Sequence, residues 1–165
     1  MLKLRKNKKG FTLVELIVVI AIMAVLAGVV AGVTVSQLNK NTDKANLSQA
    51  KGIADFVAGE IADTTSAVYK DGELDADKIK DEILKQYASV NFKKTTTTTG
   101  EGASATTTTT IADAPESKGQ FAVEVNKDSD NKVTSVHILY MNKSGGDVKG
   151  YTVSTEGVIT NYPAA

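Results

Sequence analysis

The feature that most constrains this chain is a long apolar stretch close to its N-terminus. Every residue from Leu16 to Val35 is apolar except Thr34, and no charged residue occurs between Leu16 and Gln37. Twenty helical residues at about 1.5 Å each span about 30 Å, which is the thickness of the hydrocarbon core of a bilayer. A stretch this apolar in an otherwise polar chain predicts a membrane-spanning helix.

The charges that flank this stretch predict its orientation. Five basic residues and no acidic one occur in the first ten positions: Lys3, Arg5, Lys6, Lys8 and Lys9. The first charge on the other side is Lys40. Because the more basic flank stays in the cytoplasm, we expect the N-terminus inside and residues beyond about 36 outside. Without those five, the chain has 14 basic and 19 acidic residues and is therefore acidic. Specific binding of nucleic acid is not expected of such a surface.

Two ordinary explanations of the stretch are incomplete. A secretory signal peptide would have an apolar part of about 7–15 residues followed by an Ala-x-Ala cleavage site. This stretch is longer, and its alanines, at positions 21, 24, 27 and 31, are never two residues apart. A plain signal anchor explains the length and the flanks, but it gives no reason for the acidic Glu15 at the start of the helix.

The residues around Glu15 resemble the processing site of type IV prepilins and related pseudopilins. Positions 8–16 read Lys-Lys-Gly-Phe-Thr-Leu-Val-Glu-Leu. That family has a short basic leader ending in Gly, then Phe or Met, then a Glu five residues into the mature chain, then a long apolar helix. Gly10, Phe11 and Glu15 match this pattern in order and in spacing.

The resemblance implies processing, membrane insertion and polymerisation. A membrane-embedded prepilin peptidase would cut between Gly10 and Phe11 on the cytoplasmic side, and the new amine of Phe11 would be N-methylated. The single-pass precursor in the cytoplasmic membrane would then be built by an assembly platform and its ATPase into an extracellular pilus of identical copies. We expect no cofactor, no metal and no catalytic residue. Because many Gram-negative pilins carry a disulfide, the absence of cysteine points to a Gram-positive or archaeal-like major pilin.

Glu15 has two alternative partners. An ionisable group costs about 2.5–3.5 kcal/mol at the centre of a membrane helix and less near its end, so a partner is expected. One candidate is the Phe11 amine of a neighbouring subunit, which would fix the register between helices. The other is the positive N-terminus of its own helix.

Small residues form a stripe along the predicted helix. They recur at helical spacing, and the last two belong to a GxxxG sequence that allows close approach of helices in lipid: Ala21, Ala24, Gly28 and Gly32. The alternative is that Gly and Ala are simply common in membrane helices.

The rest of the chain predicts an α+β fold, in which the long N-terminal helix packs on a C-terminal antiparallel β-sheet meander. Apolar residues continue at roughly helical spacing past the membrane: Leu38, Ala45, Ile53, Phe56, Val57, Ile61 and Val68. A short second helix is expected from about Asp75 to Gln86 or Tyr87. Alternating apolar residues in four runs after residue 120 predict strands. We divide the chain into a cleaved leader (1–10), a transmembrane or filament-core helix (11–36), an amphipathic helical part (37–92), an exposed Thr/Gly-rich loop (93–119) and a sheet (120–165).

Two tracts of five threonines distinguish the region 93–119. Threonine favours strands, so a hairpin is an alternative to the solvated loop. On the fibre exterior these threonines could also carry O-linked sugar, which the intact mass of the subunit would reveal.

Two further patterns carry little weight. Asn126–Asp130 begins like a calcium-binding loop, but Asn131 and His137 stand where Gly and Glu are needed, so a solvated turn is expected. His137 has no acid or nucleophile nearby in sequence and is interpreted as a surface residue.

The leading interpretation is therefore a structural pilus subunit serving adhesion, motility or biofilm formation. The alternatives are a pseudopilin of a type II secretion or competence DNA-uptake system, a membrane-anchored surface binding module and, least favoured, an enzyme.

Overall fold

The computed structural model describes residues 10–99 and 106–163 of the 165-residue chain. The helices and strands in this part are, in chain order, α1 (Leu13–Ala62), β1 (Tyr69–Lys70), β2 (Glu73–Leu74), α2 (Ala76–Gln86), β3 (Lys94–Thr99), β4 (Thr106–Ile111), β5 (Phe121–Lys127), β6 (Val133–Met141), β7 (Val148–Ser154) and β8 (Ile159–Tyr162). A long N-terminal helix followed by a four-stranded antiparallel sheet confirms the predicted pilin-like α+β fold.

The chain consists of two units that meet within α1, between Leu38 and Asn39. In the first unit the structure describes the first half of α1 and the residues just before it. The second unit, which we call the head, contains the second half of α1 and all other elements.

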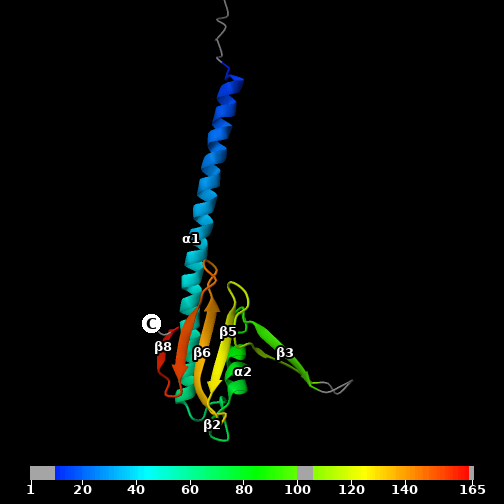
Figure 1. The fold of residues 1–165 in the computed structure, drawn as a ribbon, viewed down its shortest axis with the longest axis vertical. Helices are drawn as coiled ribbons and strands as arrows, with labels where there is room; N and C mark the ends of the chain where they lie inside the picture. Colours follow the sequence, from blue (N-terminus) through cyan, green and yellow to red (C-terminus); the bar gives the residue numbers. More distant parts are fainter. Residues whose placement is uncertain (1–9, 100–105, 164–165) are drawn as a thin grey trace, which may run out of the picture. The chain divides into compact units, whose positions relative to one another are not determined.

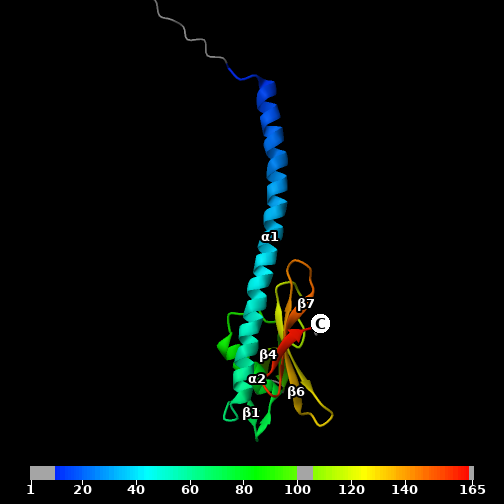
Figure 2. The same cartoon turned by 90° about the vertical axis from the view of Figure 1, so that its left-hand side faces the viewer.

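The core of the head lies between the helices and one face of the sheet. Figures 1 and 2 show that the second half of α1 and helix α2 cover the same face of β5–β8. The largest fully buried side chains come from all three parts: Ile53 and Val57 from α1, Ile79 and Ile83 from α2, and Phe121, Val123, Val136, Ile138, Tyr140 and Val153 from the sheet. β-branched and aromatic side chains of the sheet therefore face an aliphatic stripe of the helices, as in a two-layer domain.

The stripe of α1 that faces the core differs from the predicted one at both ends. Leu38 and Ala45 are exposed, whereas Asp43 is buried. Val68 is buried but lies outside the helix, which ends at Ala62. The helix stops there because the carboxylate of the next residue, Asp63, accepts hydrogen bonds from the N–H and the hydroxyl of Thr65, an alternative to helical bonding.

Helix α2 confirms the expected second helix. Asp75 is its N-cap, and the side chain accepts hydrogen bonds from the N–H groups of Asp77 and Lys78 at 3.0 Å. Its apolar side contributes Ile79 and Ile83 to the core.

The sheet is an antiparallel meander in the order β5-β6-β7-β8, as the four apolar runs predicted. Glu124 pairs with His137, and Leu139 pairs with Gly150. A Cβ atom on Gly150 would lie 1.8 Å from the carbonyl oxygen of Ile138, so the close approach of β6 and β7 requires glycine here.

The threonine tracts form a hairpin in place of the loop expected for residues 93–119. β3 and β4 pair antiparallel from Lys94↔Ile111 to Thr99↔Thr106, and the segment between them lies outside the described residues. The high strand propensity of threonine favours this ladder. Its base is fixed to the head, since Ile111 is fully buried and Lys80 of α2 forms an ion pair of 2.6 Å with Asp113 just after β4.

Candidate functional site

The residues expected at the processing site are exposed. Gly10 and Phe11 precede α1, and the Phe11 side chain is 93% exposed. A Cβ atom on Gly10 would meet no other atom within 4 Å. Nothing in the described chain therefore covers the bond between these two residues.

Thr12 and Glu15 form a capping box at the start of α1. Glu15 Oε2 accepts hydrogen bonds of 2.8 Å from the N–H and from the hydroxyl of Thr12. In return, the N–H of Glu15 donates to Thr12 Oγ1 at 3.2 Å. In this single chain Glu15 thus caps its own helix, which is one of the two alternatives that the sequence left open. Both Thr12 bonds end on Oε2, and no hydrogen bond joins Oε1 to another described residue.

Thr12 is a site residue that the sequence interpretation did not identify. The signal was present, because a Ser or Thr three residues before a Glu, immediately ahead of an apolar run, is the sequence pattern of a capping box.

The first half of α1 exposes a continuous apolar surface. The structure's described part contains one helix long and apolar enough to cross a membrane, with a mean hydropathy of 3.0 over its most apolar window, none of which is buried. The large exposed side chains include Leu16, Ile20, Met23, Leu26 and Val30. A core helix of a soluble domain would bury such side chains, so this surface needs an apolar environment.

The small residues of the stripe have no packing role inside the chain. A Cβ atom on Gly28 or Gly32 would meet no other atom within 4 Å. Helix α1 nevertheless runs without interruption through both glycines and through Ala21 and Ala24. The four small residues therefore lie on one exposed helix face, where they remain available to another helix.

Asp43 connects α1 to the loop between β6 and β7. Its carboxylate is only 8% exposed and accepts hydrogen bonds from the Tyr140 hydroxyl at 2.7 Å, from the Lys143 N–H at 2.6 Å and from the N–H and hydroxyl of Ser144. Burial alone would raise the pKa of Asp43, but the hydrogen bonds from Ser144, Tyr140 and Lys143 outweigh it and lower the pKa to about 2. Asp43 is therefore ionised and held in place.

His137 has an acidic partner that its sequence neighbours did not reveal. Its Nδ1 lies 2.9 Å from Glu124 Oε2 on the adjacent strand, and its ring lies 4.9 Å from that of Tyr162. Ser135 Oγ is 3.5 Å from His137 Nε2, at the limit of a hydrogen bond. The register Glu124↔His137 brings the acid and the imidazole together, as a cross-strand pair on the sheet.

The turn that resembles the start of a calcium loop is stabilised by its own backbone. Asp128 Oδ1 accepts hydrogen bonds of 2.9 Å from the N–H groups of Asp130 and Lys132. Asn131 adopts a φ of 63°, which asparagine tolerates in tight turns. Within the described ranges, no three His, Cys, Asp or Glu side chains are grouped so that they could hold a metal ion.

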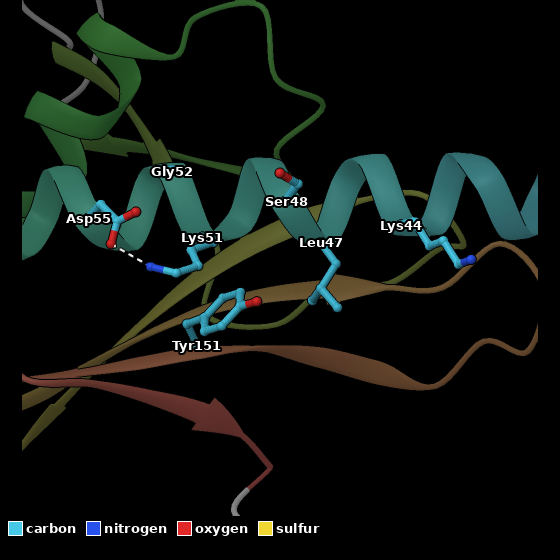
Figure 3. Close-up of a pocket in the computed structure, with 7 residues that line it drawn as sticks. All are labelled: Lys44, Leu47, Ser48, Lys51, Gly52, Asp55 and Tyr151. Atoms are coloured by element: carbon cyan, nitrogen blue, oxygen red, sulfur yellow. Dashed lines mark hydrogen bonds and ion pairs between the residues drawn. The ribbon is translucent and has the colours of Figure 1, made fainter.

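A shallow groove runs between α1 and β7 (Figure 3). Tyr151 of β7 faces the helix, and Lys51 lies beside it, with its Nζ 6.0 Å from the centre of the Tyr151 ring and 2.7 Å from Asp55. Lys44, Leu47, Ser48 and Gly52 complete the lining. The groove contains neither a nucleophile paired with a base nor a cluster of metal ligands, so its lining offers no arrangement for catalysis.

Comparison with known protein families gives a match at the N-terminus. The family described as the prokaryotic N-terminal methylation motif matches residues 5–31, which include the predicted cleavage position, Glu15 and most of the apolar stretch. No curated protein and no solved structure matches the chain.

Proposed function

We propose that this chain, which begins with a type IV prepilin-like leader and a long apolar helix, is a structural subunit of a type IV pilus. The match to the N-terminal methylation motif supports a type IV pilin-like or pseudopilin protein. The observation that carries the narrower proposal is the uncovered apolar surface of the first half of α1, joined to an independently packed head.

Processing would release the subunit from its leader. A prepilin peptidase cuts between Gly10 and Phe11, and the new amine of Phe11 is then methylated. The exposure of both residues supports access to this bond, and the missing Cβ of Gly10 lets an active site approach the backbone closely. Residues 1–10 then form the removed leader, and residues 11–36 form the membrane anchor of the precursor.

Polymerisation would transfer the apolar helix from lipid to a bundle of identical helices. Each buried methylene contributes about 0.8 kcal/mol relative to water, so a helix with this many aliphatic side chains cannot remain exposed outside the cell. The stripe formed by Ala21, Ala24, Gly28 and Gly32 offers the face along which two helices approach most closely. Assembly machinery with an ATPase supplies the energy of extraction, and the subunit itself needs no catalytic site.

Glu15 has a second role in this proposal. Because Oε2 is used to cap its own helix, Oε1 remains to accept a hydrogen bond from the cationic amine of a neighbouring subunit's Phe11. Removed from water, such a pair is attractive and fixes the axial offset between subunits more than it adds stability. The capping box prepares this contact by holding the carboxylate at the tip of the helix.

Substitutions at Glu15 separate the capping role from the pairing role. Glutamine at this position of a capping box also accepts a hydrogen bond from the backbone, so Glu15→Gln keeps the helix start but removes the charge. We expect Glu15→Ala and Glu15→Gln to insert into the membrane and to be cleaved, and both to form few or no filaments. Electron microscopy of antibody-labelled cells, with N-terminal sequencing of the mature chain, measures both steps.

Three results would count against the proposal. Filaments at the normal level from Glu15→Gln would reduce Glu15 to a helix cap. An intact Met1 on the functional protein would exclude processing. Short periplasmic or cell-wall filaments in place of long surface fibres would assign the chain to the pseudopilins.

A further inference from the structure

The β3–β4 hairpin, which we call the threonine arm, is exposed along β3 and at Thr107–Thr109 of β4. Figure 1 shows it running away from the sheet and helices of the head. All six side chains of β3 are exposed, and within the described part of the chain β3 pairs only with β4. The arm buries little besides its base, so the fold of the head does not explain its length.

Both long edges of the arm carry unpaired backbone groups. The N–H of Ala112 donates to the carbonyl of Lys93 at 2.8 Å. Antiparallel pairs alternate between bonded and non-bonded, so with the observed register the outward-pointing groups belong to every second residue. These residues are Thr96 and Thr98 on β3 and Thr107 and Thr109 on β4.

The side chains independently support this assignment. The hydroxyl oxygens of Thr96 and Thr109 lie 3.4 Å apart, as do those of Thr98 and Thr107. Side chains approach more closely in non-bonded pairs, which are the pairs whose backbone groups point outward. No hydrogen bond links those outward groups to another described residue.

These edges lack the features that prevent strand pairing. Proteins protect exposed edges with charged side chains, with proline or with bulges. Between them β3 and β4 contain one charged residue, Lys94, at the end next to the head, and no proline. Threonine has a high strand propensity, and short uncharged segments of this kind pair readily with one another.

We propose that the threonine arm pairs edge to edge with the arm of a second copy of this chain. The inference rests on the proposed function, because a filament holds many identical copies at high local concentration. An identical edge supplies the same length and the same hydrogen-bonding row, and no like charges meet along Thr95–Thr99. The edge offers no apolar or charged side chain that would select a different partner.

The pairing tolerates different offsets between copies. In most strands a slip of one residue moves the apolar set to the wrong face, which fixes the register. On this edge the outward-pointing groups belong to every second residue, so the register can shift only in steps of two residues, and within the tract of five such a shift places threonine opposite threonine again. The arms can therefore join subunits at several axial offsets, so that one contact serves copies that are not related by a single fixed geometry.

Cysteine cross-linking tests this pairing, because the natural chain contains no cysteine. Thr96→Cys, Thr98→Cys and Thr107→Cys are introduced one at a time into the full chain, and isolated filaments are oxidised. We expect disulfide-linked dimers on a non-reducing gel from at least two of the three positions, as variable register requires. Thr155→Cys, in the exposed β7–β8 turn, is the control and should remain monomeric. Dimers from none of the arm positions, or from only one, would overturn the register-tolerant pairing.

A second set of variants blocks the edge. Thr98→Pro in the Thr96→Cys chain removes an outward N–H that the arm's own ladder does not use, so the dimer should be lost. Thr98→Lys, which keeps the N–H and places like charges near the contact, should also lose it, whereas Thr98→Val should retain it. Dimers that persist in both the proline and the lysine variants would contradict the inference, as would an intact mass showing sugar on these threonines.

Failure of this inference can be distinguished from failure of the proposed function. If the unmodified chain forms no filaments, the pilus proposal is wrong. If filaments form normally but the arm cysteines never cross-link, only the pairing of the arms is wrong.

Discussion

At the scale of single residues, Asp43 makes the principal polar connection between α1 and the loop after β6. One carboxylate receives four hydrogen bonds from three residues about 100 positions away in the chain. Asn46 adds a bond of 3.0 Å to the same Tyr140 hydroxyl. The apolar core alone could slide along a helix stripe, whereas these directional bonds fix one position of the helix on the sheet.

Replacing Asp43 with asparagine should destabilise the head. The amide that replaces the carboxylate would direct an N–H₂ group toward one set of donors, so at least one buried donor loses its acceptor. We expect a loss of about 2–3 kcal/mol in the free energy of unfolding, since hydrogen bonds to a charged group contribute about 1.5–3 kcal/mol. Urea unfolding of the full chain in detergent, followed by near-ultraviolet circular dichroism, measures it. Asp55→Asn, at an exposed position of the same helix, is the control and should change stability by less than about 0.5 kcal/mol.

The same carboxylate predicts an acid-sensitive component of stability. Its pKa in the folded head is about 2, below the ordinary value of 3.8, so this contribution is present above pH 4 and is lost as the pH falls toward 2. At about 1.4 kcal/mol per pKa unit, the loss is about 2 kcal/mol. The difference in unfolding free energy between the natural chain and Asp43→Asn should shrink over this range. A difference that stays constant from pH 5 to pH 2 would show that folding does not lower the pKa of Asp43.

Single residues were only partly predictable from the sequence. Gly10, Phe11 and Glu15 form a local pattern, and local patterns can be read without a fold. Asp43 could not be identified, because it stands among other polar residues of a helix and its partners lie about 100 positions later. The acidic partner of His137 was missed for the same reason, since only the strand register brings Glu124 beside it.

At the scale of elements, the close pairing of β6 and β7 depends on a glycine. Gly150→Ala should distort the sheet, because the new methyl group would overlap the carbonyl oxygen of Ile138, and a backbone atom cannot rotate away as a side chain can. We expect a loss of about 3 kcal/mol or more in the free energy of unfolding, or failure to fold.

Gly59→Ala is the matched control. This glycine is exposed in α1, and a Cβ atom there meets nothing within 4 Å. Alanine should raise the free energy of unfolding by up to about 1 kcal/mol, because glycine is the poorer helix former. The midpoint temperature of thermal unfolding should therefore fall in Gly150→Ala and rise in Gly59→Ala. Equal shifts of the two midpoints would refute the steric explanation.

Elements with a strong periodic pattern were predicted well. The second helix and the four strands of the meander lie where their apolar spacing and turn residues indicated. The threonine tracts were ambiguous, because a run of one residue type has no periodicity to distinguish a strand from a loop. The helix stripe was misplaced at Leu38, Ala45 and Val68, since spacing alone does not show where a long helix begins to be covered.

At the scale of the whole molecule, the head and the first half of α1 should respond separately to mutation. Gly28→Leu and Gly32→Leu are expected to reduce the number of filaments, because bulk on the small-residue stripe prevents close approach of helices. They should leave the unfolding of the head unchanged, since a Cβ atom at either position meets no other atom within 4 Å. Val30→Leu, at a large exposed residue off the stripe, should have a smaller effect on filaments. A loss of head stability in the glycine variants would show that the two units are coupled.

The contact between Asp43 and the β6–β7 loop has a consequence for how the protein is made. The helix half that lines the core is synthesised before the strands of residues 121–162, which supply the sheet side of that core. Until those strands are present, Ile53, Val57 and Ile61 lack the sheet side of the core. A subunit exported as we propose would therefore at first be an anchored but incompletely folded chain, and chaperones outside the membrane would keep its apolar stripe from premature association.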